Sequence, residues 1–279
     1  MSVRDILRRH GHHPRRSLGQ NFLLDPGIAA RIVDALAPES RDAVLEIGSG
    51  TGALTGLLAE RAGYVLGVEV DYGLYGILTE ALADRENLDL VLGDVRDAKM
   101  DRLYARGNRR FLVLGNLPYC LSSEILFFLL EHGRMIDRAV LTFQREVADR
   151  IRSKPGGKEY GILSVLVQAD CEVDKVMSIP PPAFYPRPDV DSTVLLLRFT
   201  DPPPQPVSDR ALFARLVRAG FGQRRKTLRN ALSQVLSELS PGSDSKDVLS
   251  AAGIDPGRRA ETLSVPEWAG FADYLHEHK

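Results

Sequence analysis

The tetrapeptide Asn116-Leu117-Pro118-Tyr119 has the residue types best suited to chemistry, and it follows an apolar run at residues 111–114. Proline removes a backbone donor and fixes its own φ, so the turn after this predicted strand is stiff. An amide and an aromatic ring held there either complete an ordinary turn or grip a flat polar ring. The residues at the ends of the other predicted strands distinguish between these two interpretations.

A glycine-rich stretch, EIGSGTG at residues 46–52, closes an earlier predicted strand. Glycines there let the backbone turn sharply and approach a ligand closely, at a helix N-terminus that favours negative charge. We therefore expect Gly48 and Gly50 to contact a nucleoside-containing cofactor. With Ala53 the stretch also satisfies the dinucleotide fingerprint G-x-G-x-x-A, so a dehydrogenase is an alternative at this point.

Carboxylates close the next two predicted strands. Glu69 can accept hydrogen bonds from both hydroxyls of a ribose, and Asp94 can accept one from the exocyclic amine of adenine. Glycine, acid and acid at three consecutive strand ends suit a cofactor that spreads its amino acid, ribose and adenine across the sheet. This succession favours S-adenosylmethionine over a dinucleotide, because no obvious residue serves a second nucleotide.

The tetrapeptide would then lie beside the cofactor's sulfonium. An adenine N6 amine is a poor nucleophile, and acceptors on its two protons can aim its lone pair at the methyl carbon. The amide oxygen of Asn116 and a backbone carbonyl of Leu117 or Pro118 supply two acceptors. Tyr119 supplies a stacking face, worth about 1–3 kcal/mol per base. Such catalysis depends on orientation and polar preorganisation rather than on a strong general base.

An alternation of short apolar strands and helices positions these residues. It predicts a mostly parallel sheet with helices on both faces, and such sheets bind ligands outside the carboxyl ends of their strands. Asp25-Pro26 predicts the start of an earlier helix, which Pro38 ends. Residues 161–169 are ambiguous between helix and strand. The predicted strands are 43–47, 65–70, 88–92, 111–114, 139–143, 173–179 and 193–199, and the predicted helices are 54–61, 74–83, 123–131 and 144–152.

The run DPPPQP at residues 201–206 predicts a domain boundary. We expect a cofactor-binding catalytic domain at residues 1–200, whose first 24 residues form a basic segment, and a helical RNA-binding domain at 207–279. The fold class is then α/β, with a Rossmann-like sheet of the class I methyltransferase type and a small C-terminal helical domain. The helices predicted in that domain are 209–219, 223–238, 244–252 and 266–277.

The charge distribution points to a nucleic acid although the net charge is only −1. Residues 210–230 carry seven cations and no acid. We expect four of them to contact phosphates: Arg224, Arg225, Lys226 and Arg229.

The rest of the composition indicates in which cellular compartment the protein is expected. No apolar run reaches membrane-spanning length, and the N-terminus lacks a signal-peptide core. Two distant cysteines favour reduced thiols, so we expect a cytoplasmic protein, and we expect a monomer. His10, His12 and His13 lack partners for a metal site, so no metal is expected.

Seven motifs, in this order along nearly the whole chain, resemble the rRNA adenine N6,N6-dimethyltransferase family of class I methyltransferases. The small-subunit branch of that family is the more similar one. The resemblance implies that Asn21 and Leu23 also contact the cofactor. It further implies that the substrate is two adjacent adenosines near the 3′ end of 16S rRNA in the pre-30S particle, each methylated twice. The motifs are residues 17–23 (SLGQNFL), 46–52, 69–71 (EVD), 93–94 (GD), 116–119 and 184–192 (FYPRPDVDS), followed by 221–230 (FGQRRKTLRN) as a basic helix start.

Two alternatives stay open beside this interpretation. One is a large-subunit rRNA adenine methyltransferase of the antibiotic-resistance type, and the other is an RNA-binding ribosome assembly factor with secondary catalysis. The chain also departs from the family pattern at Cys120, where Asn is more frequent, and at Glu124, where Pro is common. Both departures follow the tetrapeptide, so they affect the detail of the pocket rather than the chemistry.

Overall fold

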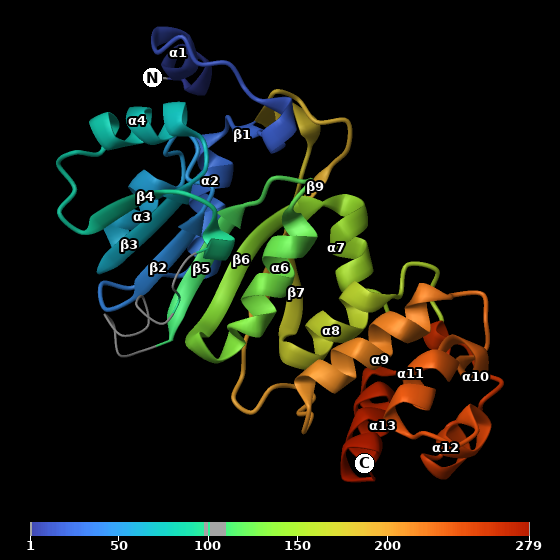
Figure 1. Cartoon of the computed structure of the whole chain (residues 1–279). Coiled ribbons are helices and arrows are strands. Elements are labelled where there is room, and N and C mark those ends of the chain that lie inside the picture. Colours follow the sequence, from blue (N-terminus) through green and yellow to red (C-terminus); the bar gives the residue numbers. More distant parts are fainter. Residues whose placement is uncertain (1, 98–99, 101–109, 279) are drawn as a thin grey trace. The chain divides into compact units, whose positions relative to one another are not determined.

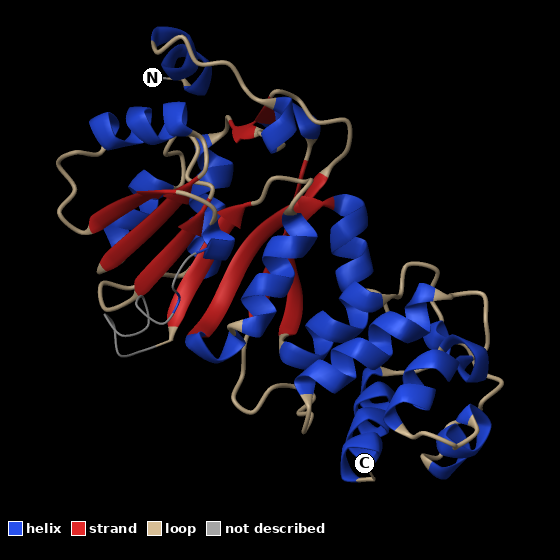
Figure 2. Cartoon of the chain, viewed as in Figure 1, coloured by secondary structure: helices blue, strands red, loops and turns tan. Residues whose placement is uncertain are grey.

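A computed structural model describes residues 2–97, 100 and 110–278. The chain forms two compact units (Figures 1 and 2). Unit 1 comprises Met1–Ala148 and Val173–Phe199, and unit 2 comprises Asp149–Glu172 and Thr200–Lys279. The chain passes between the units three times, and the third passage, between Phe199 and Thr200, lies near residue 200, where a boundary was expected. Residues 149–172 differ from expectation, because the structure groups them with the helical unit.

Unit 1 contains a seven-stranded sheet in the order β4-β3-β2-β5-β6-β9-β7. The pairs β4–β3, β3–β2, β2–β5 and β5–β6 are parallel, and β9 runs antiparallel to β6. The order reverses between β2 and β5, so a crevice at their carboxyl ends is the expected ligand site. The strands are β2 Ala43–Ile47, β3 Tyr64–Glu69, β4 Leu88–Leu92, β5 Phe111–Asn116, β6 Ile136–Gln144, β7 Glu172–Ile179 and β9 Ser192–Arg198.

Helices cover the sheet as the alternation predicts. Val44, Leu112 and Leu114 are buried in one cluster with side chains of α2 and α3. Alternate strand residues such as Val113 point to the opposite face, where α6 lies in front of β5 and β6 in Figure 1. The helices of this unit are α1 Val3–Arg9, α2 Pro26–Leu36, α3 Thr55–Arg61, α4 Tyr72–Ala81 and α6 Ser122–Glu131, with short turns η1 Arg16–Leu18, η2 Val95–Asp97, η3 Gly133–Met135 and η4 Pro181–Ala183.

The start of α2 is set by its sequence. The side chain of Asp25 accepts hydrogen bonds from the backbone of Gly27 and Ile28, and Pro26 occupies the first turn. The helix ends with Ala37 in the left-handed conformation, directly before Pro38. The predicted capping is therefore what the structure shows.

A small second sheet joins two motifs that are far apart in the chain. Strand β1, Phe22–Leu23, pairs antiparallel with β8, Phe184–Tyr185. The proline-rich segment therefore holds the stretch that precedes α2. Neither strand was predicted, because two-residue strands leave no periodic pattern.

Unit 2 is helical in the part of the chain that the structure describes beyond residue 200. The ambiguous segment at 161–169 forms a helix, α8. Helix α7, Arg145–Ile151, begins in unit 1 and ends in unit 2. The helices are α7 Arg145–Ile151, α8 Ile162–Asp170, α9 Arg210–Gly222, α10 Leu228–Ala231, α11 Ser233–Leu239, α12 Ser245–Ala251 and α13 Val265–Glu277, with η5 Ala260–Thr262.

The single helix expected at residues 223–238 is wrong. Residues 223–227 form a turn after α9, and the chain restarts as two short helices, α10 and α11. The N–H groups of Leu228 and Arg229 donate to the carbonyls of Arg258 and Pro256. These tertiary bonds satisfy the free donors of a new helix start, which a local pattern does not reveal.

Among the described residues, the helices are all too short or too polar to span a bilayer.

Candidate active site

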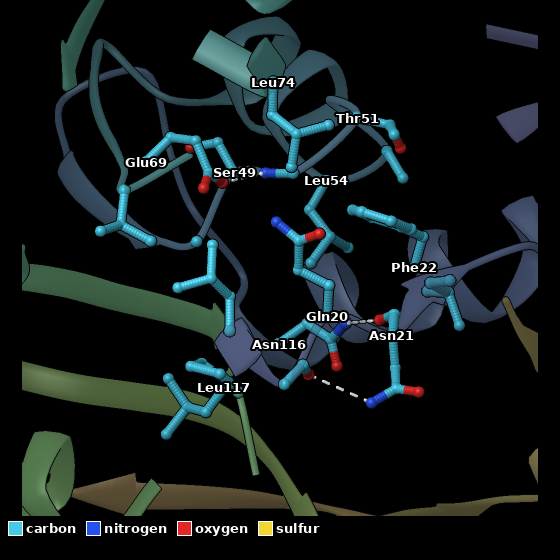
Figure 3. A pocket seen from close by; sticks show the side chains of 18 of the residues that line it. Gln20, Asn21, Phe22, Ser49, Thr51, Leu54, Glu69, Leu74, Asn116 and Leu117 are labelled. Carbon is cyan, nitrogen blue, oxygen red and sulfur yellow. Dashed lines mark hydrogen bonds between the residues drawn. The ribbon is translucent and has the colours of Figure 1, made fainter. Parts of the chain in front are cut away.

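A pocket in unit 1 lies at the carboxyl ends of the central strands and brings most of the predicted site residues together (Figure 3). Its wall also includes residues that the sequence did not single out. Phe22, Leu54, Val70 and Leu74 add apolar surface, and Gln20 adds an amide. Gln20, Phe22 and Val70 lie within two of the quoted motifs, whereas Leu54 and Leu74 were marked only as the first residues of predicted helices. The predicted residues in the lining are Asn21, Leu23, Gly48, Gly50, Glu69, Asn116, Leu117, Pro118 and Tyr119.

The glycine loop has the conformation that glycine permits. Gly48 and Gly50 have φ of 74° and 57°, in the left-handed region. A Cβ built on Gly48 would meet no atom within 4 Å, so it would project into open space. A Cβ on Gly50 would stand 3.4 Å from the ring of Phe22. The loop therefore presents bare backbone to the pocket.

Glu69 is fixed against this loop at the end of β3. One carboxylate oxygen accepts from the backbone N–H of Gly50 and the other from that of Asp71, both at 2.8 Å. Burial raises the pKa of Glu69 above its usual range, and the two backbone donors oppose the rise. The carboxylate is thus oriented before any ligand arrives, and it keeps lone pairs for further donors.

A second acid, Glu46, lies buried at the end of β2 below the loop. The hydroxyl of Thr55 donates to its Oε2 at 2.6 Å. Burial raises the pKa of Glu46 to about 7, and the hydrogen bond from Thr55 acts in the opposite direction. Glu46 is therefore a buried acid whose proton uptake depends on folding, which a titration of stability can detect.

Asn116 is oriented by the backbone of the segment before β1. Its Nδ2 donates to the carbonyl of Asn21 at 2.8 Å (Figure 3). The side chain of Asn21 in turn donates to the carbonyl of Gly19 at 3.1 Å. Because the nitrogen of the Asn116 amide is engaged, its oxygen is left as an acceptor facing the pocket residues.

The two backbone carbonyls that the sequence offered as second acceptor differ in the structure. The carbonyl of Pro118 accepts from the N–H of Leu121 at 3.0 Å, which closes the turn. The carbonyl of Leu117 has no hydrogen bond among the described residues. Leu117 is therefore the better candidate for the second acceptor.

Tyr119 is held by the proline-rich segment. Its hydroxyl lies 2.7 Å from that of Ser192, which is fully buried at the start of β9. Burial raises the pKa of Tyr119, and the bond to Ser192 opposes this effect. The hydrogen bond fixes the plane of the ring at the pocket, a role for Ser192 that its sequence alone did not indicate.

Asp94 is not part of the pocket lining. Arg96 holds its carboxylate, with Nε 3.0 Å from one oxygen and Nη2 2.6 Å from the other. Hydrogen bonding by Arg96 lowers the pKa of Asp94. Arg96 also pairs with Glu124, so the residue that departs from the family pattern has a partner at the end of β4.

The other departure, Cys120, is exposed. Its Sγ would lie 3.1 Å from a Cβ built on Gly19. Cys120 therefore packs against the segment that carries Asn21, where a side chain on Gly19 would be crowded and its φ of 61° would be strained.

The four cations predicted to bind RNA lie in unit 2, in and just after the turn at 223–227. All four are exposed: Arg224, Arg225, Lys226 and Arg229.

Two of these cations are engaged within the unit. Arg224 Nε lies 2.7 Å from a carboxylate oxygen of Glu261, and its Nη2 donates to the carbonyl of Lys158. Arg229 Nη2 lies 3.1 Å from a carboxylate oxygen of Asp244. Arg225 and Lys226 have no side-chain partner among the described residues, which leaves their charges available.

The sheet order and the crevice at its reversal define a class I methyltransferase fold. A family model for ribosomal RNA adenine dimethylase matches residues 11–277. The chain belongs to this family, so the resemblance predicted from the seven motifs is confirmed.

Individual relatives agree with this assignment. The chain is 45% identical over 280 residues to ribosomal RNA small subunit methyltransferase A of Pelotomaculum thermopropionicum, covering 97% of this chain and 94% of that protein. A crystal structure of a dimethyladenosine transferase from Plasmodium falciparum matches with a TM-score of 0.75 and 27% identity, over 90% of this chain and 95% of that one. The 23S rRNA methyltransferase ErmE matches with a TM-score of 0.67 and 25% identity, over 91% and 99%.

Proposed function

We propose that this protein uses S-adenosylmethionine to dimethylate N6 of two adjacent adenosines near the 3′ end of 16S rRNA in the pre-30S particle. The observation that carries the proposal is the orientation of Asn116. Its amide nitrogen is engaged by Asn21, so its oxygen is available to the pocket that the glycine loop and Glu69 also line.

The pocket residues fit this cofactor. The bare backbone at Gly48 and Gly50 leaves room for a ligand, and Glu69 offers acceptors for ribose hydroxyls. Phe22 and Val70 add apolar wall. When bound, the cofactor supplies a methyl carbon on a sulfonium, which passes to N6 as the C–S bond breaks and the extra N6 proton leaves to solvent.

The protein's part in the reaction is to position the amine. The Asn116 amide oxygen and the Leu117 carbonyl accept hydrogen bonds from the two N6–H groups, which directs the lone pair away from the ring plane. The ring of Tyr119, held by Ser192, stacks on the base. An adenine must first leave its own stack, at a cost of a few kcal/mol, which these contacts offset.

Titration calorimetry with S-adenosylhomocysteine tests the cofactor assignment. We expect saturable binding by the wild type. Glu69→Gln should weaken it by about 1.5–3 kcal/mol, because an amide has one acceptor oxygen where the carboxylate has two. Glu80→Gln, on the exposed side of α4, is the matched control and should leave affinity unchanged. A silent titration beside tight NAD binding would instead support the dehydrogenase alternative.

Mass spectrometry of ribosomal RNA tests the substrate. Immature small subunits incubated with the protein and cofactor should gain dimethyladenosine at two adjacent positions. Dimethyladenosine on large-subunit RNA would support the alternative that the likeness to ErmE keeps open. Binding of small subunits without methyl transfer would support the assembly-factor alternative.

Two further expectations concern the localisation and the oligomeric state of the protein. Bacterial rRNA is matured in the cytoplasm, so we infer that the protein acts there. A monomer stays a prediction, and light scattering of the purified protein at several concentrations tests it.

A further inference from the structure

The N-terminal segment, defined here as residues 2–20, is a basic stretch whose arginines have no role in the proposed function. It contains five arginines, and its only acid is Asp5. Asp5 is paired with Arg8 and with the hydroxyl of Ser2. The segment thus has a formal charge of +4, five arginines against one aspartate with histidine neutral. A fixed charge of this size on a nearly neutral chain calls for an anionic partner.

Helix α1 of this segment packs on the back of the pocket wall. Its Leu7 is buried in one cluster with Phe22, Leu74 and Ile77. Phe22 and Leu74 also line the pocket, so α1 and a pocket ligand would contact opposite sides of the same two side chains. Figure 1 shows α1 beside α4, near the end of the sheet where β1 lies.

Asp71 anchors the rest of the segment. Its side chain is fully buried and accepts from Gln20 Nε2 at 2.9 Å, besides capping α4. His12 Nε2 and Arg15 Nε lie 3.6 Å and 3.5 Å from the same carboxylate. Gln20 directly precedes Asn21 in the pocket wall, so the anchor ties the basic segment to the site.

The three arginines of α1 are exposed. The side chain of Arg8 is 81% exposed, although it pairs with Asp5. Arg9 is exposed, and its guanidinium has no partner among the described residues. Arg4 lies over the ring of Tyr185, 5.1 Å from its centroid, which places this side of α1 next to β8. Cationic side chains therefore stand on a helix that is fixed to the pocket wall through Phe22 and Leu74.

We propose that the N-terminal segment is a second RNA-binding surface, in which Arg8 and Arg9 contact phosphates of the strand that delivers the adenosine to the pocket. The inference rests on the proposed function, because it requires RNA at the pocket. Its physical basis is that an extruded adenosine brings its neighbouring phosphates to the pocket rim. Contacts to these phosphates position the RNA strand on the protein without recognising its base sequence. The surface belongs to unit 1 and is separate from the turn at 223–227.

The test compares two double variants that remove the same charge. Arg8→Ala with Arg9→Ala changes the proposed surface. Arg41→Ala with Arg134→Ala is the control. These exposed arginines lie just before β2 and β6, at the amino ends of the strands, whereas the pocket lies at their carboxyl ends. The probe is an RNA hairpin from the 3′ end of 16S rRNA that contains the two adjacent adenosines, titrated at several salt concentrations.

We expect the first variant to lower the slope of log affinity against log salt by roughly 1.4–1.8, since each phosphate contact contributes about 0.7–0.9. This change in slope corresponds to a loss of RNA affinity of more than about tenfold near 0.1 M salt. The loss becomes smaller as the salt concentration approaches about 1 M. S-adenosylhomocysteine affinity should not change, which shows that the fold and pocket are intact. The control variant should keep the wild-type slope.

Equal slopes for the two variants would overturn the inference while leaving the proposed function intact. The same holds if the first variant loses affinity for small subunits but binds the naked hairpin normally, because the segment would then contact a protein. Failure of the proposed function gives a different result, since the wild type itself would neither bind the hairpin nor methylate it.

Discussion

The crevice of unit 1 and the turn at residues 223–227 of unit 2 were both predicted from short motifs, yet they are organised in opposite ways. In the crevice, the polar side chains proposed to position the substrate are already held by a second group, as Asn116 is by Asn21 and Tyr119 by Ser192. At the turn, Arg225 and Lys226 have no side-chain partner among the described residues. The comparison teaches that preorganised polar groups suit transition-state positioning, whereas free charges suit contact with a mobile phosphate backbone.

The largest effect is expected at Asn116. Asn116→Ala should lower the rate of methyl transfer by about 10²–10³-fold, the usual loss when one preorganised polar group is removed from a reacting centre. Affinity for S-adenosylhomocysteine should stay within about twofold, because the loop and Glu69 remain. Single-turnover kinetics and calorimetry measure the two quantities. Equal loss of cofactor binding and rate would show that Asn116 is only structural and would break the comparison.

The second-largest effect concerns the pH dependence of stability, which Glu46 influences because this acid is buried at the end of β2. The unfolded chain releases this proton from about pH 4.5, whereas the folded protein keeps it to about pH 7. Over this interval the unfolded state binds fewer protons, so stability falls as pH rises, by about 3 kcal/mol in total.

Glu46→Gln should therefore flatten the profile between these pH values. Urea unfolding at pH 5, 6, 7 and 8 measures it. The exposed Glu80→Gln variant is the control and should keep the wild-type slope. Identical slopes in wild type and Glu46→Gln would contradict a desolvated acid below the loop.

The turn at residues 223–227 provides a smaller effect that sharpens the contrast. Arg225→Ala with Lys226→Ala should lower the salt slope of RNA binding by roughly 1.4–1.8 and weaken binding by more than about tenfold near 0.1 M salt. Arg224→Ala removes the contacts to Glu261 and Lys158, so it should lower stability by less than about 1 kcal/mol and change the slope less. Filter binding and thermal unfolding measure these effects. A larger RNA defect from Arg224→Ala than from the pair would reverse the assignment.

The smallest effect concerns the hydrogen bond between Tyr119 and Ser192. Tyr119→Phe and Ser192→Ala should each cost about 0.5–1.5 kcal/mol in kcat/KM for RNA, because each removes the same bond. The double variant should cost no more than the worse single variant, since the two residues act as one unit. Full additivity would mean that the bond does not position the ring.

The sequence predicted most residues of the crevice because the topology of a parallel sheet brings the ends of its strands together. Parallel strands bring their carboxyl ends to one edge, so Gly48, Glu69 and Asn116 meet in space although they lie far apart in the chain. The same reasoning placed Asp94 at this edge but could not foresee that Arg96 holds it, because the orientation of a guanidinium depends on tertiary partners such as Glu124.

Sequence did less well where tertiary contacts override local patterns. The break between α9 and α10 depends on carbonyls of residues 256 and 258, and the β1–β8 pair depends on strands of two residues each. The charge of the N-terminal segment was visible in the sequence. Its attachment to Asp71 was not, because nothing local links residues 12–20 to residue 71.

A structure of the protein with S-adenosylhomocysteine and an RNA containing the target adenosines would test the central claim most directly. We expect N6 of the adenine to lie about 2.7–3.2 Å from both the Asn116 amide oxygen and the Leu117 carbonyl, with the ring stacked on Tyr119. A target base bound outside the pocket, or an Asn116 amide that turns its nitrogen toward N6, would contradict the claim.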